Sequence, residues 1–309
     1  MQLIRGLHNW PDAVETAITI GNFDGAHLGH QAMFDEVVRT AGERALVSTV
    51  ISFNPLPHEY FVTKGAPARL QGLRDRYNSI KAAGIERLLL LDFDHEFARQ
   101  SADDFVREVL IDTLRTRHMV IGDDFRFGHQ RHGTFELLEA ASDTHGFTLQ
   151  QSPTCISGNQ RVSSTLIREH LRNGELSEAT TLLGRPYRIS GRVIHGDKVG
   201  RQLGFPTANV ALGDHRPALR GVFAAWAHDE DTGRRHAAVA NLGERPTVGG
   251  RKLLLEVHLL DAEEQLYGHH LAIDFVQALR NEQRFASLDE LKAQIARDAD
   301  AARELMSHR

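Results

Sequence analysis

The chain has 309 residues, with 36 Lys and Arg against 41 Asp and Glu and a formal net charge of −5 at pH 7. This length favours two domains over one, and the acidic balance argues against a nucleic-acid or anionic-membrane partner. The single cysteine, Cys155, excludes an intrachain disulfide and fits a reducing compartment. The N-terminal segment lacks a signal-peptide core, and no apolar run reaches the roughly 18–20 residues of a spanning helix. We therefore expect a soluble, cytoplasmic protein.

The first half of the chain alternates short apolar runs with helical patterns. The expected strands are 17–20, 46–53, 88–91, 118–121 and 147–150. The expected helices begin near residue 31 and then cover 70–80, 103–114 and 135–141. This alternation predicts a parallel sheet with right-handed crossovers, a Rossmann-like architecture that binds nucleotides at the carboxyl ends of its strands.

The second half begins with two short helical patterns and then changes character. The two helices are expected at 166–171 and 177–183, and the strands at 188–195, 222–228, 237–240, 253–260 and 271–279. No long amphipathic helix separates these strands, which predicts a compact antiparallel barrel or sandwich. A capping-box pattern at 287–290 predicts a final helix. The pattern changes near 184–187, so the predicted domains are 1–184 and 185–309.

A glycine-rich segment, 21–30, follows the first predicted strand and opens the first helix. Its glycines allow a sharp turn, and the unpaired N–H groups of a helix start favour a phosphate. His27 and His30 are three apart, so both can lie on one face and stabilise charge on a phosphate in the transition state. Two other interpretations are a turn with solvated histidines and a zinc pair, which would need at least a third ligand.

The sequence of this segment, G-x-F-D-G-x-H-x-G-H, resembles the adenylyltransferase module of bacterial riboflavin kinase/FAD synthetases, within the HxGH nucleotidyltransferases. Residues 122–133 are similar to the GxDFxFGxxRxG stretch of that family, and residues 163–168 to its SSTxIR motif, which meets the triphosphate. Arg168 lies at the start of a predicted helix, where its guanidinium can form two parallel hydrogen bonds with a phosphate. The resemblance implies catalytic roles for His27 and His30. It also implies an ATP site made of Gly21, Phe23, Asp24, Gly25, Asp124, Ser164, Thr165 and Arg168. One departure is Asn54, which stands where the family usually has a glutamate.

Residues 206–209, Pro-Thr-Ala-Asn, resemble the signature with which riboflavin kinases hold Mg-ATP. The hydroxyl of Thr207 and the side-chain carbonyl of Asn209 are suitable ligands for Mg²⁺, which prefers oxygen. Lys198 and the amides of the preceding glycine-rich loop can neutralise phosphates. The implied ATP site of the kinase is therefore Gly196, Lys198, Gly200, Thr207 and Asn209, with Thr207 and Asn209 as metal ligands.

Glu256 lies on a predicted strand whose two faces both carry apolar residues, so its carboxylate is costly there without a partner or a function. The segment 256–261 resembles the E-V-H-L-L-D stretch of riboflavin kinases, which implies that Glu256 accepts the proton of the riboflavin 5′-hydroxyl. A structural ion pair is the alternative. The segment 279–285 is also similar to the family, and Arg280 is its candidate for a flavin contact.

The resemblance extends over about residues 15–305. It implies a Rossmann-like FMN adenylyltransferase domain in 1–184 and an antiparallel β-barrel riboflavin kinase domain in 185–309 that ends in a helix. It implies an enzyme that phosphorylates riboflavin to FMN with ATP and then transfers AMP from a second ATP to FMN, giving FAD and pyrophosphate. The implied partners are riboflavin, FMN, FAD and ATP with Mg²⁺. Nucleic acid and membrane are not expected, and an oligomer is allowed but not indicated. Two alternatives are an adenylyltransferase for another mononucleotide, with a structural β-domain, and a non-catalytic flavin-binding regulator.

Overall fold

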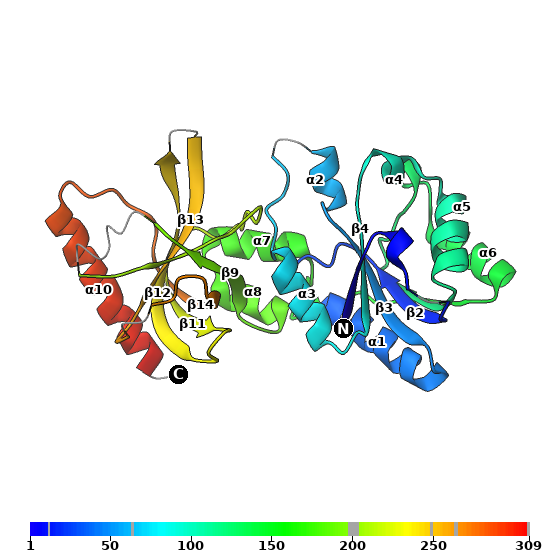
Figure 1. The fold of residues 1–309 in the computed structure, drawn as a ribbon, viewed down its shortest axis with the longest axis horizontal. Helices are drawn as coiled ribbons and strands as arrows, with labels where there is room; N and C mark the ends of the chain where they lie inside the picture. Colours follow the sequence, from blue (N-terminus) through cyan, green and yellow to red (C-terminus); the bar gives the residue numbers. More distant parts are fainter. Residues whose placement is uncertain (12, 63–64, 197–203, 248–249, 263–264, 308–309) are drawn as a thin grey trace. The chain divides into compact units, whose positions relative to one another are not determined.

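The structure is a computed structural model that describes residues 1–309 except 12, 63–64, 197–203, 248–249, 263–264 and 308–309 (Figure 1). The side chains of 245–252 are also outside the description. The chain forms two compact units, one of residues 1–67 and 76–162 and one of residues 68–75 and 163–309. The assignment of FMN adenylylation to residues 1–184 and of riboflavin phosphorylation to residues 185–309 stays a prediction. No helix in the described part of the chain is both long and apolar enough to cross a membrane.

The first unit is built on a six-stranded sheet in the order β1-β4-β3-β2-β5-β6, in which every pair is parallel. The strands are β1 (Gln2–Arg5), β2 (Thr16–Ile20), β3 (Val47–Phe53), β4 (Arg87–Leu91), β5 (Thr116–Ile121) and β6 (Thr148–Gln151). The chain runs outward from β2 through β3 to β4 and then returns to β5 on the other side of β2. The carboxyl ends of β2 and β5 therefore flank the topological switch point, where such sheets bind ligands. The predicted parallel sheet is confirmed, with the additional edge strand β1.

Helices and short elements connect these strands. They are η1 (Leu7–Asn9), α1 (Leu28–Arg44), α2 (Pro57–Phe61), α3 (Leu73–Ala82), α4 (His95–Arg99), α5 (Ala102–Asp104), η2 (Phe105–Thr113), η3 (His129–Arg131), α6 (Phe135–His145), β7 (Ile156–Ser157) and β8 (Gln160–Arg161). Alternate strand residues enter separate buried clusters on the two sheet faces, with Ile18 in one and Ala17 in the other. Burial on both faces explains why these strands are almost continuously apolar in the sequence.

The second unit contains a closed antiparallel barrel in the order β10-β13-β12-β11-β14-β9. The strands are β9 (Tyr187–Ile194), β10 (Ala208–Val210), β11 (Gly221–Asp229), β12 (Arg235–Thr247), β13 (Gly250–Leu259) and β14 (His270–Arg280). Strand β10 pairs with both β9 and β13 and closes the barrel, which removes exposed strand edges. The antiparallel barrel that the family resemblance implies is confirmed. The strand pattern by itself left a sandwich open, because the three residues of β10 are too few to show a period.

Helices also pack against the barrel of the second unit. Helices α7 (Ser164–Asn173) and α8 (Leu176–Leu183) pack on each other, and α8 contacts β9 and β14. The final helix, α10 (Leu288–Ser307), covers β11 and β12 through a buried cluster that includes Val222, Ala224, Ala299 and Ala302. The predicted helical end of the chain is confirmed.

Residues 68–75 belong to the second unit, although in the sequence they lie between the two parts of the first unit, 1–67 and 76–162. The Asp75 carboxylate accepts a hydrogen bond from the Ser190 N–H at 3.0 Å, and Arg74 forms an ion pair with Glu230 at 2.8 Å. Burial raises the pKa of the Asp75 carboxyl, although the hydrogen bonds from Ser190 oppose this effect. The segment is thus held on the barrel by contacts between residues more than a hundred positions apart.

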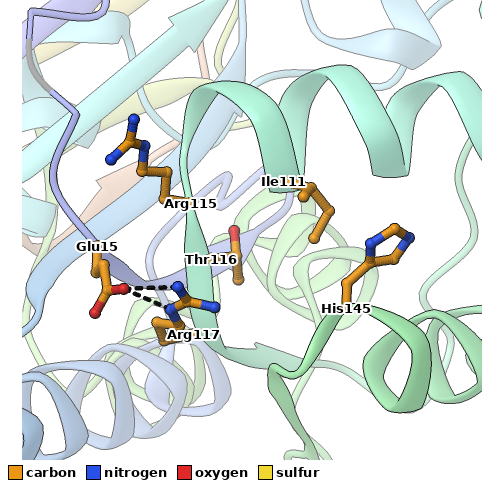
Figure 2. Close-up of a pocket in the computed structure, with 6 residues that line it drawn as sticks. All are labelled: Glu15, Ile111, Arg115, Thr116, Arg117 and His145. Carbon is orange, nitrogen blue, oxygen red and sulfur yellow. Dashed lines mark hydrogen bonds and ion pairs between the residues drawn. The ribbon is translucent and has the colours of Figure 1, made fainter.

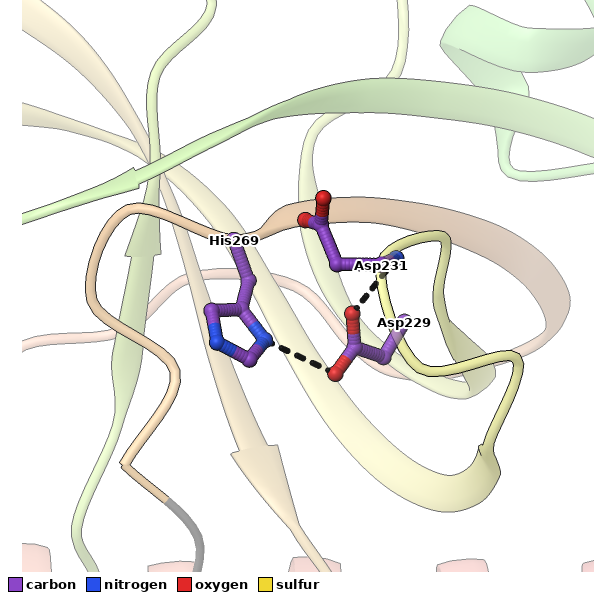
Figure 3. A group of neighbouring side chains, drawn as sticks. All are labelled: Asp229, Asp231 and His269. Atoms are coloured by element: carbon purple, nitrogen blue, oxygen red, sulfur yellow. Dashed lines mark hydrogen bonds and ion pairs between the residues drawn. The ribbon is translucent and has the colours of Figure 1, made fainter.

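The turn between β11 and β12 is fixed by the buried carboxylate of Asp229 (Figure 3). This carboxylate accepts hydrogen bonds from the His269 ring at 2.9 Å, the Thr232 hydroxyl at 2.8 Å and the Asp231 N–H at 3.0 Å. Asp231 in turn accepts from the N–H of His270 at 2.7 Å. The turn at 231–233 thus joins the antiparallel strands β11 and β12, and these bonds also attach it to the start of β14.

We expect Asp229→Asn to lower the free energy of unfolding at pH 7 by about 1–3 kcal/mol, because hydrogen bonds to a buried charge are lost. Burial alone would raise the pKa of Asp229, but the bonds from His269, Thr232 and Asp231 outweigh it and hold the pKa below its usual value. The carboxylate therefore stabilises the fold above about pH 4, and this contribution disappears as the pH falls through the lowered pKa. Urea unfolding of both proteins between pH 3 and 7 measures the effect. A difference that stays constant over this range would contradict the assignment.

Candidate active sites

The loop between β2 and α1 turns sharply within a few residues. Gly25 has φ 90°, and Phe23 and Ala26 have φ 49° and 39°. A left-handed backbone is unfavourable for residues with a side chain and is often found where a ligand must be held. Phe23 and the Asp24 carboxylate are both buried. The predicted loop residues thus form an ordered turn at the carboxyl end of β2.

The two histidines of this loop lie together at the start of α1. His27 is the N-cap residue, and its Nδ1 accepts a hydrogen bond from the His30 N–H at 3.4 Å. The two rings stack with centroids 3.6 Å apart and an interplanar angle of 16°. The rings of Phe23 and His30 are nearly perpendicular, with centroids 5.2 Å apart. A neutral His27 ring that accepts at Nδ1 carries its proton on Nε2, which makes Nε2 the donor nitrogen of this ring. The structure therefore brings together the pair that the three-residue spacing predicts.

The loop after β5 lies at the other side of the switch point. Asp123 accepts hydrogen bonds from Thr154 at 2.5 Å and from Arg161 at 2.6 Å, so it anchors the loop. The side chain of Asp124, the predicted ATP contact, is 84% exposed and lies 3.8 Å from Arg161. Asp123 thus has a structural role here, while Asp124 remains open to a ligand.

Aromatic side chains that no local sequence motif predicted gather where β3 and β4 end. Phe93 contacts Phe53, Tyr60 and Phe61 with ring centroids 5.6–5.7 Å apart, and Phe97 extends the group. Phe61 on α2 is 66% exposed, which is unusual for a large apolar ring. The recurrence of aromatic residues directly after two successive strands was the signal available in the sequence. We call Phe53, Tyr60, Phe61, Phe93 and Phe97 the aromatic cluster.

The segment that resembles SSTxIR forms the start of α7 in the second unit. Ser163 caps the helix by accepting from the Leu166 N–H at 3.2 Å, while Ser164 is half-buried and Thr165 is exposed. Arg168 is buried, and its Nε donates to the Ala68 carbonyl at 2.6 Å. Since His27 and His30 belong to the first unit, a triphosphate shared by all these groups stays a prediction.

Three polar residues form a row across neighbouring barrel strands. The register places Asn209 of β10 and Asn241 of β12 opposite Glu256 of β13, one on each side. Asn241 Nδ2 donates to the Glu256 carboxylate at 3.4 Å, and Asn241 Oδ1 is buried without a hydrogen-bond partner in the described part of the chain. The adjacent residues Leu255 and Val257 point into the barrel core and are fully buried, so Glu256 is on the outer face.

The Pro-Thr-Ala-Asn run leads into this row. A Cβ on Gly196 would collide with the side-chain amide of Asn209, so this amide keeps its present position only with glycine at 196. Thr207 is half-buried, and Asn209 is buried. The predicted phosphate contacts Lys198 and Gly200 lie outside the described residues.

Arg280, the predicted flavin contact, forms a two-pronged ion pair with the buried Asp298 of α10. Its Nε lies 3.0 Å and its Nη2 lies 2.8 Å from the same Asp298 oxygen. The guanidinium also lies over the Phe285 ring at 5.7 Å. These contacts hold β14 to the last helix, and a direct contact of Arg280 with flavin stays a prediction.

We call Asn209, Glu256 and Asn241 the barrel row. Their side-chain oxygens are suitable ligands for a divalent cation that prefers oxygen. Asn209 and Glu256 offer oxygens from adjacent strands, and Thr207 precedes Asn209 by two residues. Asn241 Oδ1, which lacks a partner within the described residues, adds an acceptor beside them. In the described part of the chain, the three-residue group with metal-ligand spacing is Asp229, Asp231 and His269, which the hairpin hydrogen bonds explain. Neither His27 nor His30 belongs to this group, so among the described residues the zinc interpretation gains no third ligand.

A pocket of 230 Å³ lies at the opposite, amino-terminal end of β2 and β5 (Figure 2). Its lining residues are Glu15, Ile111, Arg115, Thr116, Arg117 and His145. Arg117 is neutralised by an ion pair with Glu15 at 2.7 Å. None of the predicted site residues contributes to this pocket.

Comparison with known proteins agrees with both units. Residues 10–166 match the FAD synthetase family, and residues 183–306 match the riboflavin kinase family. The chain is 45% identical to the bifunctional riboflavin kinase/FMN adenylyltransferase of Haemophilus influenzae, with 98% of each chain covered. It is 46% identical to the protein of that name from Pseudomonas fluorescens, covering 99% of this chain and 98% of the relative. A crystal structure named as a macrolide-efflux protein from Streptococcus pneumoniae has TM-score 0.84 at 28% identity, covering 98% of this chain and 99% of that one, and supports the fold.

The parallel-sheet unit carries a histidine pair at its switch point, and the barrel carries Glu256 between Asn209 and Asn241. Together they define a transferase with two sites that acts on nucleotides. The predicted fold and family are confirmed. The chain belongs to the bifunctional riboflavin kinase/FMN adenylyltransferase family.

Proposed function

We propose that this chain phosphorylates riboflavin with ATP to FMN in its barrel and adenylylates FMN with ATP to FAD in its parallel-sheet unit. The observation that carries the proposal is the barrel row. Glu256 lies between Asn241 and Asn209, and Asn209 is the last residue of the Pro-Thr-Ala-Asn run. A structural β-domain would not need this arrangement. The stacked pair His27 and His30, at the switch point of the sheet, supports the second activity.

In the kinase reaction, Glu256 accepts the proton of the riboflavin 5′-hydroxyl, whose oxygen attacks the γ-phosphorus of ATP while ADP leaves. Asn241 donates to the carboxylate and fixes its orientation. Thr207 and Asn209 would hold Mg²⁺ together with ATP, and the bound ion would offset the charge of the phosphates. The buried Asn241 oxygen accepts from a hydroxyl of the substrate, which satisfies it.

In the adenylyltransferase reaction, a phosphate oxygen of FMN attacks the α-phosphorus of ATP and pyrophosphate leaves. His27 and His30 donate to the α-phosphate as its charge increases in the transition state. Gly21, Phe23, Asp24 and Gly25 shape the loop that receives ATP, with Asp124 on the adjacent loop. Ser164, Thr165 and Arg168 are proposed to meet the triphosphate. The aromatic cluster binds the flat isoalloxazine ring of FMN by stacking.

One assay tests the proposal against both alternatives. Purified protein is incubated with riboflavin and Mg-ATP, and riboflavin, FMN and FAD are separated by chromatography. The proposal requires both products. An adenylyltransferase for another mononucleotide would form neither, and a non-catalytic binder would quench flavin fluorescence without product.

Replacing Thr207 by valine should abolish Mg²⁺-dependent FMN synthesis, because valine resembles threonine in shape but offers no oxygen to the metal. Adenylylation of supplied FMN should continue. The measurement is a Mg²⁺ titration at fixed ATP, with each half-reaction followed separately. Full kinase activity of Thr207→Val at low Mg²⁺ would remove Thr207 from the metal site.

We expect Phe61→Ser to raise the KM for FMN in adenylylation by up to about tenfold, since an aromatic contact contributes roughly 0.5–1.5 kcal/mol. The KM for riboflavin in phosphorylation should not change. Leu288→Ser is a matched control, because Leu288 is similarly exposed and lies outside the aromatic cluster. Equal effects of the two variants on FMN adenylylation would argue against a flavin site at Phe61.

A further inference from the structure

His258 lies on β13 two residues after Glu256 and contacts the run that carries the metal ligands. Its Nδ1 is 2.8 Å from the Pro206 carbonyl oxygen, so the ring N–H donates to that carbonyl. The Phe205 ring packs edge-on against the imidazole, with centroids 5.5 Å apart and an angle of 81°. One side chain therefore holds two consecutive residues directly before Thr207.

The pairing of β10 with β13 explains why this anchor is needed. The described ladder joins Ala208 to Val257 and Asn209 to Glu256, and β10 begins at Ala208. Continued by one step, the antiparallel register would place Thr207 opposite His258. Thr207 is thus held from one side by the ladder at Ala208 and from the other by the ring bond at Pro206. An ordered backbone at both neighbours limits where its hydroxyl can lie.

The same strand carries the proposed base and the anchor on one face. Successive strand residues point to opposite faces, so Glu256 and His258 share the outer face while Val257 is buried in the core. The position of the Thr207 and Asn209 oxygens relative to the carboxylate is consequently set within β13 and its immediate partner. Small displacements of such groups weaken binding of a metal–nucleotide complex, because the ligand geometry of Mg²⁺ is strict.

We propose that His258 is a positioning residue of the kinase site. Through the Nδ1–H bond to Pro206 it places Thr207 and Asn209 for Mg-ATP, and it does not itself touch the reacting atoms. This inference rests on the proposed kinase activity. It requires the neutral ring to carry its proton on Nδ1, since a carbonyl oxygen can only accept.

Three substitutions test the bond specifically. The amide nitrogen of asparagine lies as far from Cβ as Nδ1 does, so His258→Asn keeps the donor, whereas the amide nitrogen of glutamine corresponds to Nε2. His258→Leu removes the donor but keeps an apolar side chain. We expect His258→Leu and His258→Gln to raise the KM for ATP and the Mg²⁺ concentration for half-maximal phosphorylation about five- to tenfold, the effect of one hydrogen bond. His258→Asn should restore most of this loss.

The controls distinguish positioning from folding. The KM for riboflavin and the adenylylation of supplied FMN should be unchanged in all three proteins. His270→Leu is a matched control, because His270 is on β14, which does not pair with β13, and its hydrogen bond to Asp231 is made by the backbone N–H. An independent measurement is the tautomer of the His258 ring, obtained from ¹⁵N-histidine spectra of the full chain and assigned by the signal lost in His258→Asn. We expect a proton on Nδ1.

Several results would overturn the inference. They are an Nε2–H tautomer, an unchanged KM for ATP in His258→Leu, or equal impairment of the leucine and asparagine proteins. A loss that affects riboflavin, ATP and adenylylation together, with a lower Tm, would assign His258 a structural role only. If wild-type protein formed no FMN, the proposed function itself would fail, which is a separate and recognisable outcome.

Discussion

Glu256→Gln should lower FMN formation from riboflavin by on the order of 10²–10⁴, the usual contribution of a positioned general base. Glutamine keeps the shape of the side chain but cannot accept the hydroxyl proton. The half-reaction from supplied FMN to FAD should proceed almost as in the wild type, because Glu256 belongs to the barrel and the histidine pair to the other unit. Following both half-reactions by chromatography on the same protein preparation gives the comparison.

A second variant, at Asn241, distinguishes the carboxylate that accepts the proton from the side chain that donates a hydrogen bond to it. Asn241→Ala should lower FMN formation less than Glu256→Gln does, since it removes a hydrogen bond to the carboxylate and leaves the carboxylate in place. If Glu256→Gln retains full kinase activity, or if it stops both reactions equally while the protein remains folded, Glu256 is not the base.

His27→Ala and His30→Ala should each reduce adenylylation of FMN by on the order of 10²–10³, the typical cost of one lost donor to a transition-state oxyanion. The two effects should not add, because the rings stack at 3.6 Å and His27 also caps α1. Phosphorylation of riboflavin should be retained. The rates of FAD formation from supplied FMN, measured for both single variants and the double variant, give the coupling directly.

His145→Ala is the appropriate control for these substitutions. His145 is an exposed histidine of the same unit, in the pocket at the amino-terminal end of the sheet (Figure 2). We expect it to leave adenylylation unchanged. Wild-type FAD yield from His30→Ala, or an equal loss in His145→Ala, would contradict the role assigned to the histidine pair.

The order of apolar strand and helix patterns predicted a parallel sheet followed by an antiparallel β-domain, and the capping box at 287–290 predicted the final helix. The structure confirms all three. The local motifs were also accessible, because His27 and His30 are three residues apart and Thr207 and Asn209 two. Such groups lie within one turn or one strand end, so their proximity follows from the backbone period.

The tertiary structure alone decided how distant segments complete each site. It closed the barrel through the three residues of β10, placed Asn241 beside Glu256 across fifteen residues, and gathered the aromatic cluster from the ends of β3 and β4. It also placed Asp75 on β9, 115 residues away. The sequence by itself determined which residue types and local periods are present. Contacts over long loops depend on strand register and loop closure, which no local pattern encodes.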